Sequence, residues 1–135
     1  MGRWQQLSNT PRLFCDTGHN IGGFQYIVPQ ILAQPCKHLR IVFGMVNDKD
    51  INAVLALLPK HAVYYFTQAS VARALDCKSL QAIAAQHGLQ GATYPTVIEA
   101  TRTVLAEADK DDFIYVGGSS FIVADLLANW NEIIV

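Results

Sequence analysis

Five short runs of apolar, β-branched and aromatic residues recur along the chain, and each is at most about as long as one β-strand. They read RLFCD, HLRIVFGMV, AVYYFTQ, ATYP and FIYVGG. The segments between them have helical character, and each follows a residue that can cap a helix. Strands that alternate with helices form a mostly parallel sheet with helices on both faces. The pattern therefore predicts an α/β fold.

The expected helices are placed by their capping residues. The first follows Asn20 and runs to about residue 33, and Pro29 inside it is expected to kink the helix or to end its first part. Its apolar stripe consists of Phe24, Ile27, Val28, Ile31 and Leu32. Four further helices are expected after Asp50, Asp76, Thr96 and Ser119 or Ser120. The opening RWQQL adds an antiparallel edge strand, which gives a Rossmann-like, three-layer α/β/α sheet of five to six strands.

Composition restricts the classes of function. The 135 residues are 51% apolar and 16% charged, with a formal net charge of −1, which indicates one domain over residues 1–135 and neither a nucleic-acid nor a membrane partner. Three cysteines without close spacing indicate a reduced, cytoplasmic chain with no disulfide framework. The opening MGRWQQL has the character of a segment already under way, so we expect a fragment.

The loops that follow the strands are the expected site. Ligands of such sheets bind beyond the carboxyl ends of the strands, so residues 16–20, 44–50, 68–74, 95–96 and 117–120 share one edge. Gly18 and Gly23 have the spacing of a phosphate loop, but Phe24 and Gln25 stand where that motif needs Lys and then Ser or Thr. The turn is therefore not the main triphosphate cradle, and it is expected to favour an anion or a carbonyl group.

Each polar loop residue has a chemical and a structural interpretation. Asp16 can accept two ribose hydroxyls or stabilise a turn. His19 can shuttle a proton, donate to a phosphate or carboxylate, or point into water. Ser119 can bind a carboxylate or cap a helix. A metal site from Asp16, His19 and Asp48 lacks a second histidine and a nearby thiolate pair, so no metal is expected.

The order of these motifs resembles the C-terminal domain of the Mur-ligase superfamily, specifically its folylpolyglutamate and dihydrofolate synthases. Arg3 in GRWQ resembles the Gly-Arg at the start of that domain, and CDTGHN resembles its Asp-Gly-Ala-His-Asn block. VFGMVNDKD, ARAL and DDFIYVGGSSFIV resemble later blocks in the same order. The resemblance covers nearly the whole chain.

This resemblance implies a function. Such enzymes use ATP to activate a carboxylate as an acyl phosphate, which the amino group of glutamate attacks; the acceptor is dihydropteroate, a folate, or both. It implies that Asp16 holds the ATP ribose, that Arg3 approaches the phosphates, and that His19 and Ser119 line the place of glutamate or the acyl phosphate. ATP and Mg would be bound mostly by an N-terminal domain absent from this chain, which we expect to be monomeric and inactive alone.

Three alternatives stay open. The chain is a stand-alone α/β module that binds a small ligand or regulates another protein, or it is the equivalent domain of a Mur ligase that acts on peptidoglycan precursors. A small hydrolase that uses Asp16 and His19 would need a nucleophile that the sequence does not reveal.

Overall fold

The computed structural model describes residues 2–47 and 50–135, so Asp48 and Lys49 of the NDKD stretch lie outside it. Within the described residues the sheet has six strands in the order β1-β2-β6-β3-β4-β5. They are β1 (Gln5–Asn9), β2 (Arg12–Asp16), β3 (Leu39–Phe43), β4 (Val63–Phe66), β5 (Gly91–Thr93) and β6 (Phe113–Gly117). All neighbours are parallel except β1, which pairs antiparallel with β2 at one edge. The predicted α/β fold with one antiparallel edge strand is confirmed.

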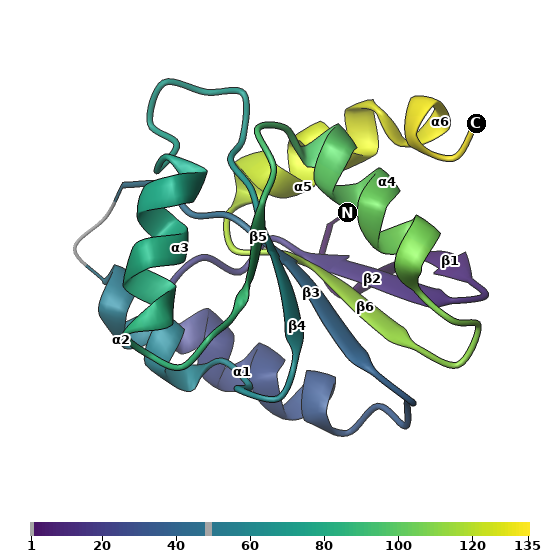
Figure 1. Ribbon diagram of the computed structural model, residues 1–135, viewed down its shortest axis with the longest axis horizontal. Helices are drawn as coiled ribbons and strands as arrows, with labels where there is room; N and C mark the ends of the chain where they lie inside the picture. Colours follow the sequence, from purple (N-terminus) through teal and green to yellow (C-terminus); the bar gives the residue numbers. More distant parts are fainter. Residues whose placement is uncertain (1, 48–49) are drawn as a thin grey trace.

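The helices cover the two faces of the sheet in two groups (Figure 1). One face carries α1 (Ile21–Leu32), α2 (Ile51–Leu57) and α3 (Cys77–Ala85). The other carries α4 (Val97–Glu107), α5 (Ser120–Ala128) and the short α6 (Trp130–Ile133). Each group packs its apolar side chains on the sheet, and this gives two separate buried cores. None of the described helices combines the length and the apolarity needed to cross a bilayer.

Most of the predicted helix starts are confirmed by capping hydrogen bonds. Side-chain oxygens of Asn20, Asp76, Thr96 and Ser119 each accept a hydrogen bond from a backbone amide in the first turn of the helix that follows. Asp50 occupies the position before α2, but its side chain makes no capping hydrogen bond.

Two details of α1 differ from the expectation: of the two outcomes predicted for Pro29, the end of the helix is wrong, and Leu32 is not buried with the rest of the stripe. The helix does not end at Pro29, because Ile27 and Ile31 on either side of the proline are buried in the core and hold the segment helical. Proline has no N–H to donate to the carbonyl of Gln25, and Gln25 lies on the exposed face of the helix. Leu32 does not belong to the buried stripe, since it is 54% exposed one position beyond Ile31.

The order of the strands reverses around β6. The connections from β2 through β5 run across one face, whereas α4 returns over the other face and inserts β6 between β2 and β3. Gly117 at the end of β6 pairs with Asp16 on one side and with Phe43 on the other, so three strands end together. Next to them, Gly118 has φ +111°, and a Cβ there would lie 2.1 Å from the carbonyl oxygen of Gly44. Only glycine allows the loops to meet this closely.

Candidate functional site

A cleft of about 510 Å³ lies at the carboxyl end of β2, between the N-terminal segment and α1. Its lining includes Arg3, Asp16 and His19, which are three of the four residues predicted from the sequence. It also includes Tyr26 from the second turn of α1, whose side chain is 71% exposed. The structure therefore brings together a guanidinium, a carboxylate and an imidazole from separate parts of the chain.

Asp16 is the most constrained of these groups and is only 7% exposed. Its Oδ1 accepts a hydrogen bond from the backbone N–H of Gly18 at 2.8 Å, and its Oδ2 accepts one from the backbone N–H of Trp4 at 2.7 Å. The first bond confirms the interpretation of Asp16 as a turn residue, and the second ties β2 to the N-terminal segment. Each carboxylate oxygen can accept a further hydrogen bond, so two hydroxyl donors remain chemically allowed.

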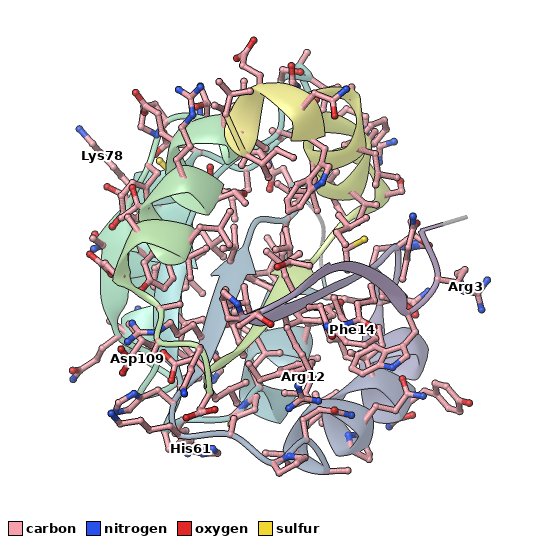
Figure 2. All side chains as sticks on the ribbon, turned by 90° about the vertical axis from the view of Figure 1, so that its right-hand side faces the viewer. Arg3, Arg12, Phe14, His61, Lys78 and Asp109 are labelled. Atoms are coloured by element: carbon pink, nitrogen blue, oxygen red, sulfur yellow. The ribbon has the colours of Figure 1, made fainter. Side chains whose placement is uncertain are left out.

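The N-terminal segment is held against the end of β2 by backbone and ring contacts. The Thr17 N–H donates to the Gly2 carbonyl oxygen at 2.8 Å. The indole ring of Trp4 packs against Phe14, with ring centroids 5.0 Å apart. Arg3 lies between the anchored residues Gly2 and Trp4. Its side chain is exposed and points away from the body of the protein (Figure 2). A positive charge therefore stands at the mouth of the cleft.

The loop before α1 is compact because of its glycines. A Cβ on Gly18 would lie 2.4 Å from Cδ1 of Ile27, so this position has no room for a side chain. The loop leaves His19 exposed, with its Nδ1 3.4 Å from the Thr17 carbonyl oxygen. The amino end of α1, with its partial positive charge, faces the same cleft. This arrangement favours an anionic ligand.

Ser119 lies apart from the other three predicted residues. It follows β6 at the same edge of the sheet, but it is 2% exposed and does not line the cleft. Its Oγ accepts a hydrogen bond from the Ile122 N–H at 3.2 Å and caps α5. The capping interpretation is thus confirmed, while the hydroxyl proton stays free to donate to another group.

The buried groups beneath the cleft are held in their neutral forms. Burial, reinforced by the charge of Asp16, raises the pKa of the Cys15 thiol to about 11. Burial and the same charge raise the pKa of Tyr115 well above its ordinary value. A protonated, buried thiol is a poor nucleophile, so Cys15 does not supply the nucleophile that a hydrolase would need.

A polar cluster that the sequence did not indicate lies at the other end of the strands, next to the amino ends of β3 and β6. His38, Asp109 and Asp112 place ligand atoms within 4.8 Å of one another, and they form the one such cluster among the described residues. Both oxygens of Asp112 already accept hydrogen bonds. Its Oδ2 accepts from Arg40 Nε at 2.8 Å and from the Asp109 N–H at 2.9 Å, and its Oδ1 accepts from the His38 N–H at 3.1 Å. Figure 2 shows Asp109 on the other side of the molecule from Arg3.

The hydrogen bonds of this cluster explain its electrostatics. Burial alone raises the pKa of Asp112, but the Arg40 hydrogen bond, the backbone amides of Asp109 and His38 and the Arg40 charge together lower it. The Arg40 guanidinium also donates to the Tyr65 hydroxyl at 2.9 Å. The cluster therefore serves to tie together β3, β4 and the loop before β6, and it adds no ligand group to the cleft.

Trp4, Tyr26 and Gln30 also line the cleft and were not predicted as functional. Trp4 contributes through its backbone amide, and no sequence pattern signals that a tryptophan amide faces a carboxylate twelve residues away. Tyr26 and Gln30 are one turn apart on α1, and the Oε1 of Gln30 is buried without a hydrogen-bond partner. The one signal in the sequence is that the aromatic residue at position 26 lies outside the apolar stripe of the helix.

Comparison with known proteins identifies relatives of this chain. A family model described as "Mur ligase, glutamate ligase domain" matches residues 2–120. The dihydrofolate synthase/folylpolyglutamate synthase of Escherichia coli is 32% identical over 130 residues, which cover 93% of this chain and 29% of that enzyme. A probable bifunctional folylpolyglutamate synthase/dihydropteroate synthase of Halobacterium salinarum is 29% identical over 132 residues, or 97% of this chain and 16% of that protein.

A solved structure has the same fold. The bifunctional folylpolyglutamate synthase/dihydrofolate synthase of Yersinia pestis, complexed with AMPPNP and Mn ion, superimposes with a TM-score of 0.84 at 29% sequence identity. The match covers 96% of this chain and 31% of that one. The chain thus spans less than a third of each of these relatives.

Proposed function

The chain belongs to the Mur ligase family, as its glutamate ligase domain, and from this premise we propose that it forms one side of the active site of an ATP-dependent ligase that adds glutamate to dihydropteroate or to folates. The observation that carries the proposal is the cleft in which Arg3, Asp16 and His19 meet beside the amino end of α1. These groups are suited to a nucleotide and an acyl phosphate, because both ligands are anions that carry hydrogen-bonding oxygens.

Each residue has a distinct role in the proposal. The Arg3 guanidinium attracts the phosphates of ATP, and the free lone pairs of Asp16 accept the ribose hydroxyls. His19 lies at the amino end of α1 and contacts the incoming glutamate or the acyl phosphate. In the proposal Ser119, which lies outside the cleft at the turn after β6, donates a hydrogen bond from its hydroxyl to the part of the substrate that reaches this turn.

The reaction requires that two surfaces close on the reactants. The acceptor carboxylate takes the γ-phosphoryl group of ATP and releases ADP; the glutamate amine then attacks the acyl carbon, phosphate leaves, and the amine loses a proton. An acyl phosphate is hydrolysed by water, so a closed and dry site protects it and orients the amine. In this proposal the chain supplies one wall of that site, as part of a monomeric, cytoplasmic enzyme.

The other wall belongs to an N-terminal domain that provides the phosphate loop. The turn from Gly18 to Gly23 lacks the Lys and the hydroxyl that such a loop needs, since Phe24 and Gln25 stand in their places. A divalent cation neutralises phosphate charge when it is bound, and in the cleft described here Asp16 is the single carboxylate among the lining residues. One carboxylate is fewer oxygen ligands than a divalent cation takes from protein and phosphate together, so in this proposal most of the cation's ligands come from the other wall and the nucleotide.

The test uses the longer protein encoded by the native reading frame together with the isolated chain. We expect the longer protein to incorporate labelled glutamate into dihydropteroate or a folate with release of ADP, and the isolated chain to be inactive. Changing His19→Ala or Arg3→Ala should lower kcat/KM by about 100-fold or more, as the loss of a group that stabilises transition-state charge does. Asp125→Asn, on α5, serves as the matched control and should retain activity.

Two outcomes contradict the proposal. Ligation by the isolated chain would show that no second wall is needed. Incorporation of amino acids into a peptidoglycan precursor, with none into pterin acceptors, would assign the chain to the other branch of the family.

A further inference from the structure

The backbone next to Arg3 is strained. Among the described residues, Trp4 is the one non-glycine residue with positive φ, at +46°. The left-handed region is unfavourable for residues with a Cβ, and a bulky residue there needs contacts that hold it. Gly2, two positions earlier, also has positive φ, at +74°. The segment over the cleft therefore makes a left-handed turn of the backbone, bent at Arg3 and Trp4, before β1 begins at Gln5.

Several contacts hold Trp4 in this conformation. Its indole ring lies 5.0 Å from the ring of Phe14, 6.1 Å from that of Phe113 and 6.4 Å from that of Tyr115. Its backbone N–H donates to Oδ2 of Asp16 at 2.7 Å. These contacts act on both the side chain and the backbone, so they offset the strain at φ.

This backbone conformation directs the side chains of Trp4 and Arg3 away from each other. The ring of Trp4 is drawn onto the aromatic cluster at the sheet, while the side chain of Arg3 points outward (Figure 2). The same turn brings the Trp4 amide to Asp16, whose other oxygen is held by Gly18. The conformation of Trp4 thus sets the backbone next to Arg3 and supplies one of the two backbone hydrogen bonds to the Asp16 carboxylate.

We propose that Trp4 is a positioning residue: its ring anchors a left-handed turn that holds the Arg3 guanidinium and the Asp16 carboxylate in the arrangement that a nucleotide requires. The inference rests on the proposed function, because it concerns the same ligand. It assigns to Trp4 no contact with the nucleotide.

A matched series at position 4 tests the two parts of this idea in the longer protein encoded by the native reading frame. Trp4→Phe keeps an aromatic anchor and should retain AMPPNP affinity within about three-fold. Trp4→Gly and Trp4→Ala both lose the ring, but only glycine adopts the left-handed turn without strain. We therefore expect the glycine variant to bind AMPPNP about five-fold more tightly than the alanine variant. Trp130→Ala, in the other core, should lower Tm and leave AMPPNP affinity unchanged.

The readouts are NMR titration with AMPPNP and Mg²⁺ and, without nucleotide, the backbone ¹⁵N heteronuclear NOE of Arg3 and hydrogen exchange at residue 4. Trp4→Ala should make Arg3 mobile and expose the residue-4 amide, and Trp4→Gly should do so less. Equal order of Arg3 in wild type and in Trp4→Ala would overturn the inference. An AMPPNP affinity of Trp4→Ala equal to or higher than that of Trp4→Gly would also overturn it. A longer wild-type protein that orders Arg3 but binds no AMPPNP would contradict the proposed function and leave the ordering of Arg3 by Trp4 in place.

Discussion

Replacing Asp16 with asparagine separates the two uses of this carboxylate. Asp16→Asn keeps one carbonyl oxygen but puts an NH₂ group where the second acceptor stood, so either the Trp4 or the Gly18 amide loses its partner. A lost hydrogen bond to a charged group costs about 1.5–3 kcal/mol, and the site is buried, so the full value applies. For a chain of 135 residues this corresponds to a fall in Tm of roughly 10 °C.

Urea denaturation and thermal unfolding, followed by circular dichroism, measure this loss. The matched control is Asp125→Asn, because Asp125 also accepts two hydrogen bonds, from the backbone N–H and the hydroxyl of Ser70, but at an exposed position. Its loss should amount to less than about 1 kcal/mol, since exposed charged groups keep their contact with water. If Asp16→Asn changed the free energy of unfolding by less than about 0.5 kcal/mol, the clamp between β2 and the N-terminal segment would not stabilise the fold.

Further predictions concern the stability of the fold at low pH and the effect of replacing two glycines with alanine. Because the pKa of Asp112 is lowered in the folded protein, chiefly by Arg40 against the effect of burial, its contribution to stability is complete above about pH 3.9 and falls as the pH drops through the folded pKa. Urea midpoints between pH 6 and pH 2 should therefore fall more steeply in wild type than in Asp112→Asn. Gly118→Ala should destabilise by more than about 2 kcal/mol, because its Cβ would meet the Gly44 carbonyl at φ +111°. Gly22→Ala has open space in a helix, so its Tm should rise slightly.

The fold was predictable because its signals are local. RLFCD corresponds residue for residue to β2, and the caps of α1, α3, α4 and α5 are hydrogen-bonded as expected. The errors came where packing overrules propensity. Pro29 is carried inside α1 by its buried neighbours, and the length of the stripe misplaced Leu32 in the core.

The candidate site was predictable only in part. Asp16 and His19 could be placed at this end of the sheet because the carboxyl ends of parallel strands meet there, whereas Arg3 was predicted only from the family resemblance. The tie between Asp16 and the Trp4 amide could not, because a backbone hydrogen bond between segments leaves no mark on residue type. Neither could the Asp112 cluster, whose members come from loops more than 70 residues apart along the chain.

The double use of Asp16 has a thermodynamic consequence. The same carboxylate holds the N-terminal turn and, in the proposed function, accepts the ribose hydroxyls. If the turn orients that carboxylate, ordering the turn must strengthen nucleotide binding, and by reciprocity a bound nucleotide must stabilise the turn to the same extent. Any segment that precedes Gly2 is joined to the domain through this turn. The direction in which that segment leaves the domain is therefore linked to nucleotide binding in the cleft. A carboxylate that served only as a turn residue would carry no such linkage, and the order of Arg3 would then be the same with and without AMPPNP.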